Sequence, residues 1–410
     1  MKLKDIFKLE IKSVAPQRDV HYHLYSLPSF DENKTREEVN GQDIMSNKLV
    51  VPDKCILFNK LNVRFKRVWK IDNQDDNKLA STEFLPLVVN EQLVDFNFAY
   101  FLLISDSLTD YLCGQNSNTS GSHKRIDPNV LLNMDIILPN RSEQERIGRL
   151  LSEIDDKIAL NREINRNLEA MARQLYDYWF VQFDFPDENG KPYKSSGGKM
   201  VWNEKIKREI PEGWKIVSLP TIATFTNGLA CQKFRPKSED EKLPVIKIRE
   251  MRDGITSESE WVAADIPDAV KVYDGDILFS WSASLEVMIW TGGEGGLNQH
   301  IFKVEPKSYY PKAFVYIQIL DYISVFKGIA EARKTTMGHI TQDHLNQSQI
   351  VIPASKSILQ AFENTISPIV NLFVKLSQQS KQLMRQRDKL LPLLMNGQVS
   401  VMPREINCDL

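Results

Sequence analysis

The sequence of 410 residues is short of cysteine, of long apolar runs and of net charge. Its four cysteines, Cys55, Cys113, Cys231 and Cys408, lack any CxxC spacing, which favours free thiols in a reducing cytoplasm over disulfides or a zinc site. No apolar run reaches the roughly 20 residues of a membrane-spanning helix, and the first ten residues lack the apolar segment of a secretory signal. We therefore expect a cytoplasmic protein. The net charge of −2 excludes no partner, because a nucleic-acid binder can concentrate its basic residues locally.

Catalytic motifs are also scarce. The absence of a Pro-Pro pair excludes the Asn/Asp-Pro-Pro-aromatic motif of amino-methyltransferases, and no Gly-Lys-Ser/Thr loop for ATP is present. Of the nuclease-like Pro-Asp pairs, only the one that ends at Asp53 is followed at a plausible distance by an acid-x-Lys, Asp76 with Lys78. That pattern is short and common by chance. His21 and His23 alternate on one face of an expected strand without an evident third metal ligand. We predict neither a catalytic site nor a metal or cofactor in this chain.

A long helix is predicted over residues 142–183, because apolar residues recur there at alternating steps of four and three. Ser142 with Glu145 supplies a capping box at its start. At about 1.5 Å per residue, a helix from Ser142 to Phe180 runs to nearly 60 Å, which is the length of a spacer. We call the recurring positions the seam. In this helix the seam consists of Ile147, Leu151, Ile154, Ile158, Asn161, Asn165, Leu168, Ala172, Leu175 and Trp179.

The chain contains an internal repeat, which indicates a repeated structural unit. Strand-like DIILP at 135–139 is matched by QIVIP at 349–353, each just before a predicted helix. KCILF at 54–58 is matched by GDILF at 275–279. The offset between copies drifts from 214 to 221 residues, as loop insertions inside one repeated unit would produce.

The seam also recurs, 215 residues later and with identical spacing. Ser357 with Gln360 repeats the capping box. This second helix has two defects, because Pro368 must kink or restart it and Pro392 threatens its last turn. Its seam consists of Phe362, Ile366, Ile369, Phe373, Leu376, Ser380, Leu383, Arg387, Leu390 and Leu394.

The predicted fold class is α+β, with two pseudo-repeated α/β domains separated by two long helices that form an antiparallel coiled coil. Asn161, Asn165 and Ser380 would fix the register of the helices, and Arg387 would lay its stem along the seam with its charge in water. Simple solvation of these four residues is the alternative. The expected order is a first domain at 1–141, a spacer helix at 142–183, a linker at 184–210, a second domain at 211–354, a second spacer helix at 355–397 and a C-terminal tail at 398–410.

Two unlike domains held apart suit a split target, such as DNA with two half-sites about one helical turn, roughly 34–36 Å, apart. Residues 54–70, KCILFNKLNVRFKRVWK, carry six basic residues and three aromatic ones but no acid. This composition suits a strand pair whose one face meets phosphates, and a solvated hairpin is the alternative. The DNA contacts predicted from this stretch are Lys60, Asn62, Arg64, Lys66 and Arg67.

A second kind of candidate loop precedes each proline-ended strand, NSNTSGSHKRI at 116–126 and EARKTTMGHIT at 331–341. Small, hydroxyl and basic residues on such a loop can approach a groove and offer donors to base edges, although a plain polar loop is the alternative. Weaker candidates lie at 228–237, 279–284 and 297–301, and Trp281 is expected in the core. The DNA contacts predicted from all these loops are Ser120, Ser122, His123, Lys124, Arg125, Lys233, Arg235, Ser282, Asn298, Gln299, Arg333, Lys334, Thr335, Thr336 and His339.

Over essentially its full length, the chain resembles the specificity (S) subunits of Type I restriction-modification systems. The most telling stretch is MARQLYDYWFVQFDFPDENGKPYKSSGGKMVWNEKIKREIPEGW at 171–214, and LNQHIFKV and LLPLLMNGQVSV are similar as well. The order of domain, helix, domain and helix is also that of the family. The resemblance implies that each domain is a target recognition domain that reads one part of a bipartite, asymmetric site in double-stranded DNA.

The resemblance further implies that the helices act as a ruler and as a docking surface for two methyltransferase subunits. Those partners would carry S-adenosylmethionine and methylate adenine N6, and motor-nuclease subunits with ATP and magnesium would join for restriction. The chain itself would then be a non-catalytic subunit. Two alternatives stay open, namely a specificity adaptor of a methylation-only or other defence complex, and a coiled-coil scaffold that binds no DNA.

Overall fold

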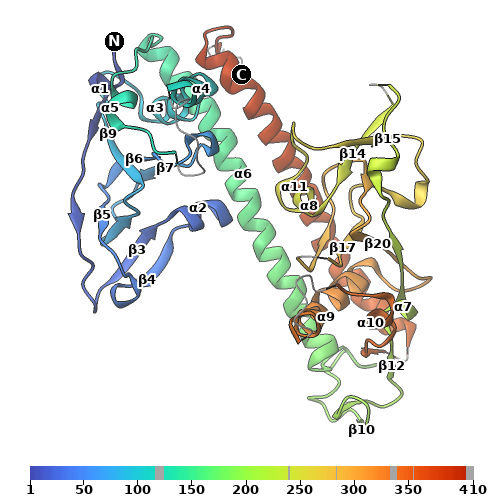
Figure 1. The fold of residues 1–410 in the computed structure, drawn as a ribbon. Helices are drawn as coiled ribbons and strands as arrows, with labels where there is room; N and C mark the ends of the chain where they lie inside the picture. Colours follow the sequence, from blue (N-terminus) through green and yellow to red (C-terminus); the bar gives the residue numbers. More distant parts are fainter. Residues whose placement is uncertain (116–123, 239–240, 283, 333–338, 354, 403–410) are drawn as a thin grey trace, which may run out of the picture. The chain divides into compact units, whose positions relative to one another are not determined.

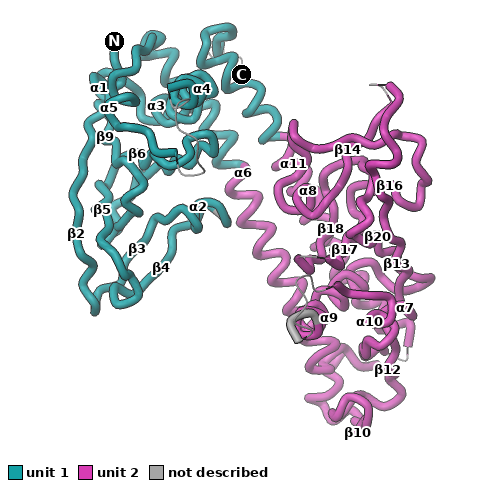
Figure 2. Tube along the Cα trace, viewed as in Figure 1, with its two compact units in different colours: residues 1–157, 383–410 teal, residues 158–382 magenta. Residues whose placement is uncertain are grey.

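The computed structural model describes the chain except for residues 116–123, 239–240, 283, 333–338, 354 and 403–410. The chain divides into two compact units (Figure 2). Unit 1 comprises residues 1–157 and 383–410, and unit 2 comprises residues 158–382. The division passes through both long helices, so each unit contains a stretch of each helix, whereas the sequence predicts the helices as segments separate from the domains.

Unit 1 contains two sheets, drawn mostly in blue in Figure 1. The first is antiparallel with the order β1-β9-β6-β7, formed by β1 (Phe7–Leu9), β9 (Phe84–Val89), β6 (Lys54–Asn59) and β7 (Val68–Asp72). The second has the order β2-β5-β8-β3-β4, formed by β2 (Ser13–Val14), β5 (Lys48–Val50), β8 (Lys78–Ala80), β3 (His21–Tyr25) and β4 (Glu37–Asn40). Within the second sheet, β3 and β8 are parallel and the other pairs are antiparallel.

Short helices complete unit 1, namely α1 (Leu3–Ile6), α2 (Leu27–Asn33), α3 (Phe96–Leu103), α4 (Asp106–Gln115) and α5 (Pro128–Leu132), with 3₁₀ turns at Gly41–Asp43 and Val63–Phe65. The larger core packs the first sheet and α3 against the long helices. Ile147 and Leu151 of the first long helix and Leu391 and Leu394 of the second are buried in this core. The helix pair is therefore part of the fold of unit 1.

Unit 2 repeats the first sheet of unit 1. Its antiparallel sheet has the order β13-β20-β17-β18, formed by β13 (Ala223–Asn227), β20 (Ile301–Pro306), β17 (Ile277–Ser280) and β18 (Glu286–Ile289). The one-turn helix α7 (Leu219–Ile222) leads into β13 as α1 leads into β1. Because the strand order and direction agree, β17 and β18 correspond to β6 and β7, and β20 corresponds to β9.

Three further sheets lie in unit 2. One has the order β15-β14-β19-β16, formed by β15 (Trp261–Ala263), β14 (Lys242–Ile246), β19 (Gly295–Leu297) and β16 (Lys271–Val272). The second is the pair of β12 (Lys215–Val217) and β21 (Ile350–Ile352). The third is the hairpin of β10 (Met200–Asn203) and β11 (Arg208–Pro211). The helices are α8 (Ile248–Asp253), α9 (Lys312–Ala332) and α10 (Gln342–Asn346), with 3₁₀ turns at Cys231–Lys233 and Asp268–Val270. None of the helices in the described residues is long and apolar enough to cross a membrane.

The two long helices are α6 (Arg141–Tyr176), which ends in a π-helical turn at Asp177–Val181, and α11 (Lys356–Met395). In unit 2 their pairing is antiparallel, because Asn161 Nδ2 donates to Gln379 Oε1 at 2.9 Å and Asn165 Nδ2 donates to Ser377 Oγ at 2.8 Å. Every predicted seam residue is buried or half-buried. Apolar burial along the seam therefore holds the pair together in each unit.

The helix starts differ from prediction. Asn140 Oδ1 accepts from the backbone N–H of Glu143 at 3.0 Å, whereas Ser142 Oγ accepts from Arg146. At α11, Ser355 Oγ accepts from the backbone N–H of Ser357 at 3.2 Å. The predicted capping boxes are therefore wrong, because an Asn or Ser two residues before the predicted cap accepts from a backbone N–H of the first turn.

The predicted restart of the second helix at Pro368 is also wrong, because α11 runs without a break through both prolines. Ile366 is fully buried and Ile369 is half-buried on either side of Pro368. Burial of such side chains offsets the roughly 3 kcal/mol that a proline inside a helix costs.

The segment 184–210, which the sequence predicts as a linker, is packed within unit 2. Phe185 stacks on Trp214, with ring centroids 5.1 Å apart, and on Tyr193 at 4.7 Å. The Asp184 carboxylate accepts from the backbone N–H and the hydroxyl of Ser195 at 2.7 and 2.6 Å. Its Gly- and Ser-rich composition forms tight turns that return the chain to the core, and β10 and β11 complete the segment.

Gly148 allows α6 to approach the start of α3 in unit 1. A Cβ atom at this position would lie 2.6 Å from Asp95 Oδ1 and 2.8 Å from the backbone nitrogen of Phe98. Asp95 caps α3, and Gln144 of α6 accepts from the backbone N–H of Asp95 at 3.0 Å. The glycine that weakens the helix in isolation is therefore required by the packing of the domain on it.

Candidate nucleic-acid interface

The hairpin loop between β6 and β7 presents the basic stretch of unit 1. Val63 is buried and anchors the 3₁₀ turn, while Arg64 and Phe65 are exposed. Asn62 and Lys66 flank the turn with φ values of +51° and +47°, in the left-handed region that costs a non-glycine residue roughly 1–2 kcal/mol. Strain of this kind persists only where the surrounding fold enforces it.

An exposed aromatic ring lies at the tip of this loop. The Phe65 side chain is half exposed, and the guanidinium groups of Arg64 and Arg67 each lie 4.7 Å from its ring centroid. Arg67 also donates to both carboxylate oxygens of Asp31, at 2.6 and 2.7 Å, and Lys66 pairs with Asp106. Arg64 makes no ion pair with a described residue, so its charge is available to a phosphate.

The second predicted loop of unit 1 joins the hairpin loop. The backbone N–H of Ile126 donates to the carbonyl of Lys60 at 2.9 Å, and the N–H of Lys60 donates to the carbonyl of Glu83 at 2.9 Å. Arg125 donates to Glu83 Oε1 at 2.7 Å and Oε2 at 2.9 Å. This hydrogen bonding, with the charges of Arg125 and Lys60, holds the pKa of Glu83 below its usual value despite partial burial. Lys124 is also described, whereas the predicted contacts Ser120, Ser122 and His123 lie outside the described residues.

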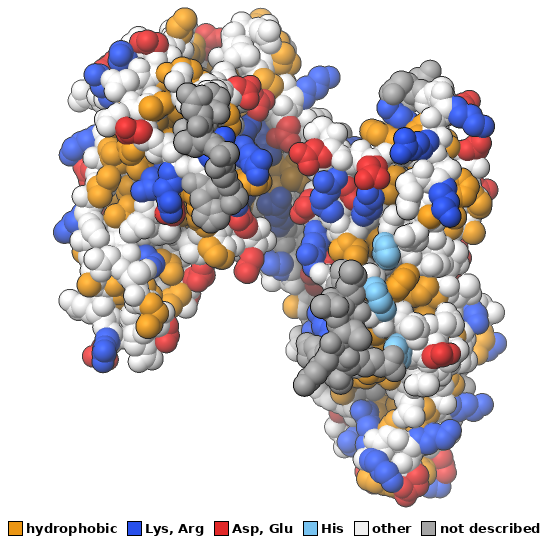
Figure 3. All heavy atoms as spheres, viewed as in Figure 1, with side chains coloured by type: hydrophobic (Ala, Val, Ile, Leu, Met, Phe, Trp, Pro, Cys, Tyr) orange, Lys and Arg blue, Asp and Glu red, His pale blue; other side chains and the backbone are white. Residues whose placement is uncertain are grey.

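Unit 2 repeats this backbone arrangement. The N–H of Trp281 donates to the carbonyl of His300 at 3.2 Å, and the N–H of Ile340 donates to the carbonyl of Trp281 at 2.9 Å. The ring centroid of Trp281 lies 5.6 Å from that of His300 and 5.7 Å from that of His339. Figure 3 shows histidine side chains gathered on one face of this unit. The predicted contacts Arg333, Lys334, Thr335 and Thr336 lie outside the described residues.

The remaining predicted contacts of unit 2 fall into two groups. Ser282 and Asn298 are buried, and Asn298 Oδ1 accepts from the backbone N–H of His300 at 3.3 Å, so neither side chain reaches a groove as placed. Asn298 instead supports the backbone of its own loop. Lys233 and Arg235 are exposed and Gln299 is half-buried, and the backbone N–H of Gln299 donates to the carbonyl of Leu229, which joins their two loops.

The site predicted from the sequence did not include Glu83, Asp31 or Asp106. These acids come from segments outside the basic stretch and meet it only in the folded chain. The repeat does contain a signal for Glu83, because Glu83 precedes β9 as His300 precedes β20.

The nuclease-like residues do approach one another in unit 1. Asp53, Asp76 and Lys78 line a cavity of about 430 Å³. Lys78 is buried, and its ammonium group donates to Asp53 Oδ1 at 2.8 Å and to the carbonyl and side-chain oxygens of Asn73 at 2.5 and 3.2 Å. All three of its protons are thus used within the fold. The described residues contain no group of three or more His, Cys, Asp or Glu that could hold a metal ion.

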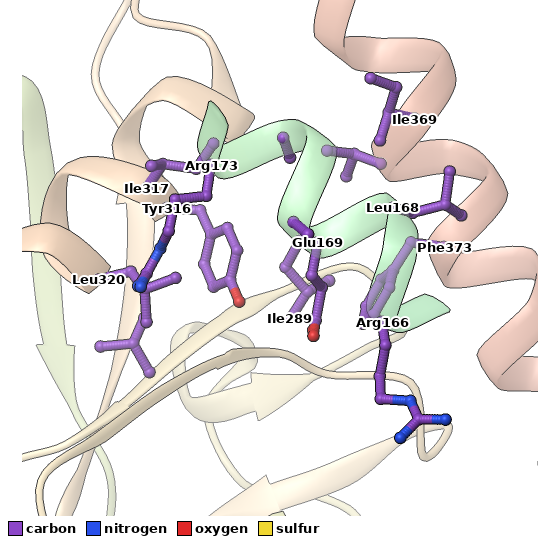
Figure 4. Close-up of a pocket in the computed structure, with 14 residues that line it drawn as sticks. Arg166, Leu168, Glu169, Arg173, Ile289, Tyr316, Ile317, Leu320, Ile369 and Phe373 are labelled. Atoms are coloured by element: carbon purple, nitrogen blue, oxygen red, sulfur yellow. The ribbon is translucent and has the colours of Figure 1, made fainter. Parts of the chain in front are cut away.

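A second cavity, of about 550 Å³, lies in unit 2 between α6, α9, α11 and β18 (Figure 4). Its lining is mostly apolar, and Figure 4 shows Tyr316 and Glu169 between Arg173 and Arg166. Burial raises the pKa of Glu169 above its usual value, although Arg173 opposes this. None of the loop residues described above lines this cavity.

The comparisons with known proteins agree with this organisation. The family described as Type I restriction modification DNA specificity domain matches the chain twice, over residues 1–170 and 211–382. The chain belongs to this family. Each match includes one copy of the repeated sheet, β1-β9-β6-β7 or β13-β20-β17-β18, with its hairpin loop, so the internal repeat is a repeat of the specificity domain.

Two curated specificity subunits are similar over most of their length. The Type I restriction enzyme HindI specificity subunit of Haemophilus influenzae is 24% identical, over 84% of this chain and 86% of that protein. The MjaIX specificity subunit of Methanocaldococcus jannaschii is 20% identical, over 98% and 89%. Among solved structures, the Type I restriction-modification S subunit from M. genitalium shares the fold, with a TM-score of 0.58, 13% identity and coverage of 96% and 95%.

Proposed function

We propose that this chain is the DNA sequence-specificity subunit of a Type I restriction-modification complex and that each unit reads one part of a bipartite, asymmetric site. The observation that carries the proposal is that three equivalent segments meet in each unit. They are the hairpin loop, the residue just before the neighbouring strand and the second predicted loop. The same two backbone hydrogen bonds join these segments in both units, while the side chains are charged in unit 1 and aromatic in unit 2. A shared frame with different side chains is what two recognition surfaces for different base sequences require.

We further propose that the helix pair carries the remaining functions of a specificity subunit. Its length sets the gap between the half-sites, and its outer faces dock two methyltransferase subunits and, for restriction, motor-nuclease subunits. S-adenosylmethionine, ATP and magnesium then belong to those partners, and this chain contributes no catalytic group. The many exposed residues on α6 and α11 opposite the seam support the proposal, because they leave a helical surface on which partners can dock.

The test is single-molecule sequencing of DNA from cells that express this chain with and without its neighbouring methyltransferase gene. The expected result is an adenine-methylated bipartite motif that appears only when both are present. The same motif without any restriction gene nearby would identify an adaptor for methylation alone. Absence of any motif, together with DNA binding that does not weaken as salt rises, would overturn the proposal in favour of a scaffold, since phosphate contacts make affinity fall steeply with salt.

A further inference from the structure

Glu83 and His300 occupy the same backbone position in the two repeated sheets. Each directly precedes the strand that lies between the edge strand and the hairpin, β9 in unit 1 and β20 in unit 2. The carbonyl of each accepts from the first residue of the hairpin loop, Lys60 at 2.9 Å and Trp281 at 3.2 Å. Because the equivalent residue in unit 2 is a histidine, the fold itself does not require an acid at this position.

The Glu83 carboxylate is partly exposed and is held in one orientation by Arg125. Its side chain is 20% exposed, and the bidentate contact with Arg125 fixes the plane of the carboxylate. Each oxygen accepts from Arg125 and keeps lone-pair capacity for a further donor. Arg125 is itself 53% exposed, so the pair is accessible from solvent.

The bidentate pair with Arg125 neutralises the charge of the Glu83 carboxylate, so what this carboxylate can offer to DNA is its remaining acceptor capacity. Base edges offer matching donors, because cytosine N4 and adenine N6 present exocyclic amino groups in the major groove and Glu or Asp accepts from such a group. Resting on the function proposed above, we propose that Glu83 accepts a hydrogen bond from the exocyclic amino group of a cytosine or adenine in the half-site read by unit 1, with Arg125 as its positioning residue.

The experiment uses the full chain with its methyltransferase and a plasmid library in which both half-sites are randomised, read by methylation sequencing. Glu83→Gln replaces half of the acceptor capacity with an N–H donor. The expected result is a change of about tenfold or more in base preference at one position of one half-site. The other half-site and the gap stay unchanged, which also shows that the variant is folded.

Three companion variants make the outcome decisive. Glu91→Gln removes a charge two residues beyond the far end of β9, where Glu91 pairs with Lys54 at 2.8 Å, and should change nothing. Arg125→Lys should lower methylation without changing the preferred base. Glu83→Asp keeps the acceptor but shortens it, and should weaken methylation while keeping the base, which tests the position even if Glu83→Gln does not fold.

The failure of this inference differs from the failure of the proposed function. A wild-type chain that yields no bipartite motif overturns the proposed function itself. A wild-type motif that Glu83→Gln leaves unaltered at every position, even at a lower rate, overturns only the role of Glu83. A base change in Arg125→Lys but not in Glu83→Gln would assign the reading to Arg125 and would equally overturn the proposal.

Discussion

Arg387 of α11 donates from Nη1 to Asp155 Oδ1 of α6 at 2.8 Å, across the helix pair of unit 1. Both side chains are about one-quarter exposed, and Arg387 also donates to Asp388 at 2.7 Å. Burial lowers the pKa of Arg387, but the hydrogen bonds and charges of the two acids outweigh burial and leave the pKa above its usual value. The seam arginine is therefore paired within the fold, whereas the sequence suggested a charge in water.

Asp155→Ala should lower the free energy of unfolding by about 1–2 kcal/mol, because it leaves a partly buried guanidinium with only an exposed partner. The measurement is urea denaturation of both variants and the wild type. Asp388→Ala is the matched control, because Asp388 is 63% exposed and its loss should cost less. Equal losses for the two variants would show that the cross-helix pair contributes no more to the free energy of unfolding than the exposed pair does.

Asn161→Leu should raise the free energy of unfolding by about 1 kcal/mol. Asn161 is fully buried, and its Oδ1 has no hydrogen-bond partner among the described residues. Its partner Gln379 is exposed and can bond to water after the substitution, while leucine fills the seam. A loss of stability in thermal unfolding would mean that a buried water satisfies this oxygen and that the asparagine is favourable.

Glu250 of α8 should make the stability of unit 2 depend on pH. Burial raises its pKa, but hydrogen bonds from Arg249, Ser259 and the backbone N–H of Lys247 outweigh burial and hold the pKa below its usual value. A lowered folded-state pKa gives stability that is present above the unfolded pKa of about 4.3 and is lost as the pH falls through the lowered value.

Glu250→Gln should therefore cost about 1 kcal/mol at pH 7, and the melting temperatures of variant and wild type should converge as the pH falls from 5 to 3. The matched control is Glu258→Gln, because Glu258 also contacts Arg249, at 3.4 Å, but is 81% exposed. A difference that stays constant with pH would assign the effect to packing rather than to the charge.

The coarse organisation was readable from the sequence, and the reasons are physical. A seam at alternating steps of four and three reports burial along one helical stripe, so residues such as Leu151 and Ile366 could be placed without tertiary information. The order of strand-like runs likewise predicted a repeated domain. The helix starts failed, because Asn140 and Ser355 can each cap and only the local backbone decides which residue does.

The chemistry of the site was readable only in part. The stretch around Arg67 contains no acid, yet Asp31 neutralises that arginine from 36 residues away. Local charge patterns cannot show such partners, because they depend on which segments the fold brings together. The same limit explains why Asn298, whose amide suits a base edge, is instead buried as part of the loop that it supports.

Arg64→Ala should weaken binding to non-specific double-stranded DNA and reduce the slope of log K against log salt by about 1, since one phosphate contact is lost. Arg67→Ala is the matched comparison, because Asp31 already neutralises that guanidinium. It should change the slope less and should lower the melting temperature of the chain instead. Identical slopes for wild type and Arg64→Ala would remove the hairpin tip from the DNA interface.

Four residues inserted after Leu168 should lengthen the gap between the half-sites without altering either half-site sequence. The insertion adds about one helical turn, or roughly 6 Å, and leaves the contacts of Asn161 and Asn165 in place. Figure 4 shows Leu168 of α6 beside Phe373 of α11, so a second variant with four further residues after Phe373 lengthens both helices at matching places. Both variants should shift the gap in methylation sequencing, and the paired insertion should retain more stability because the seam stays matched. An unchanged gap in a folded, methylating variant would show that the length of the helix pair does not set the spacing.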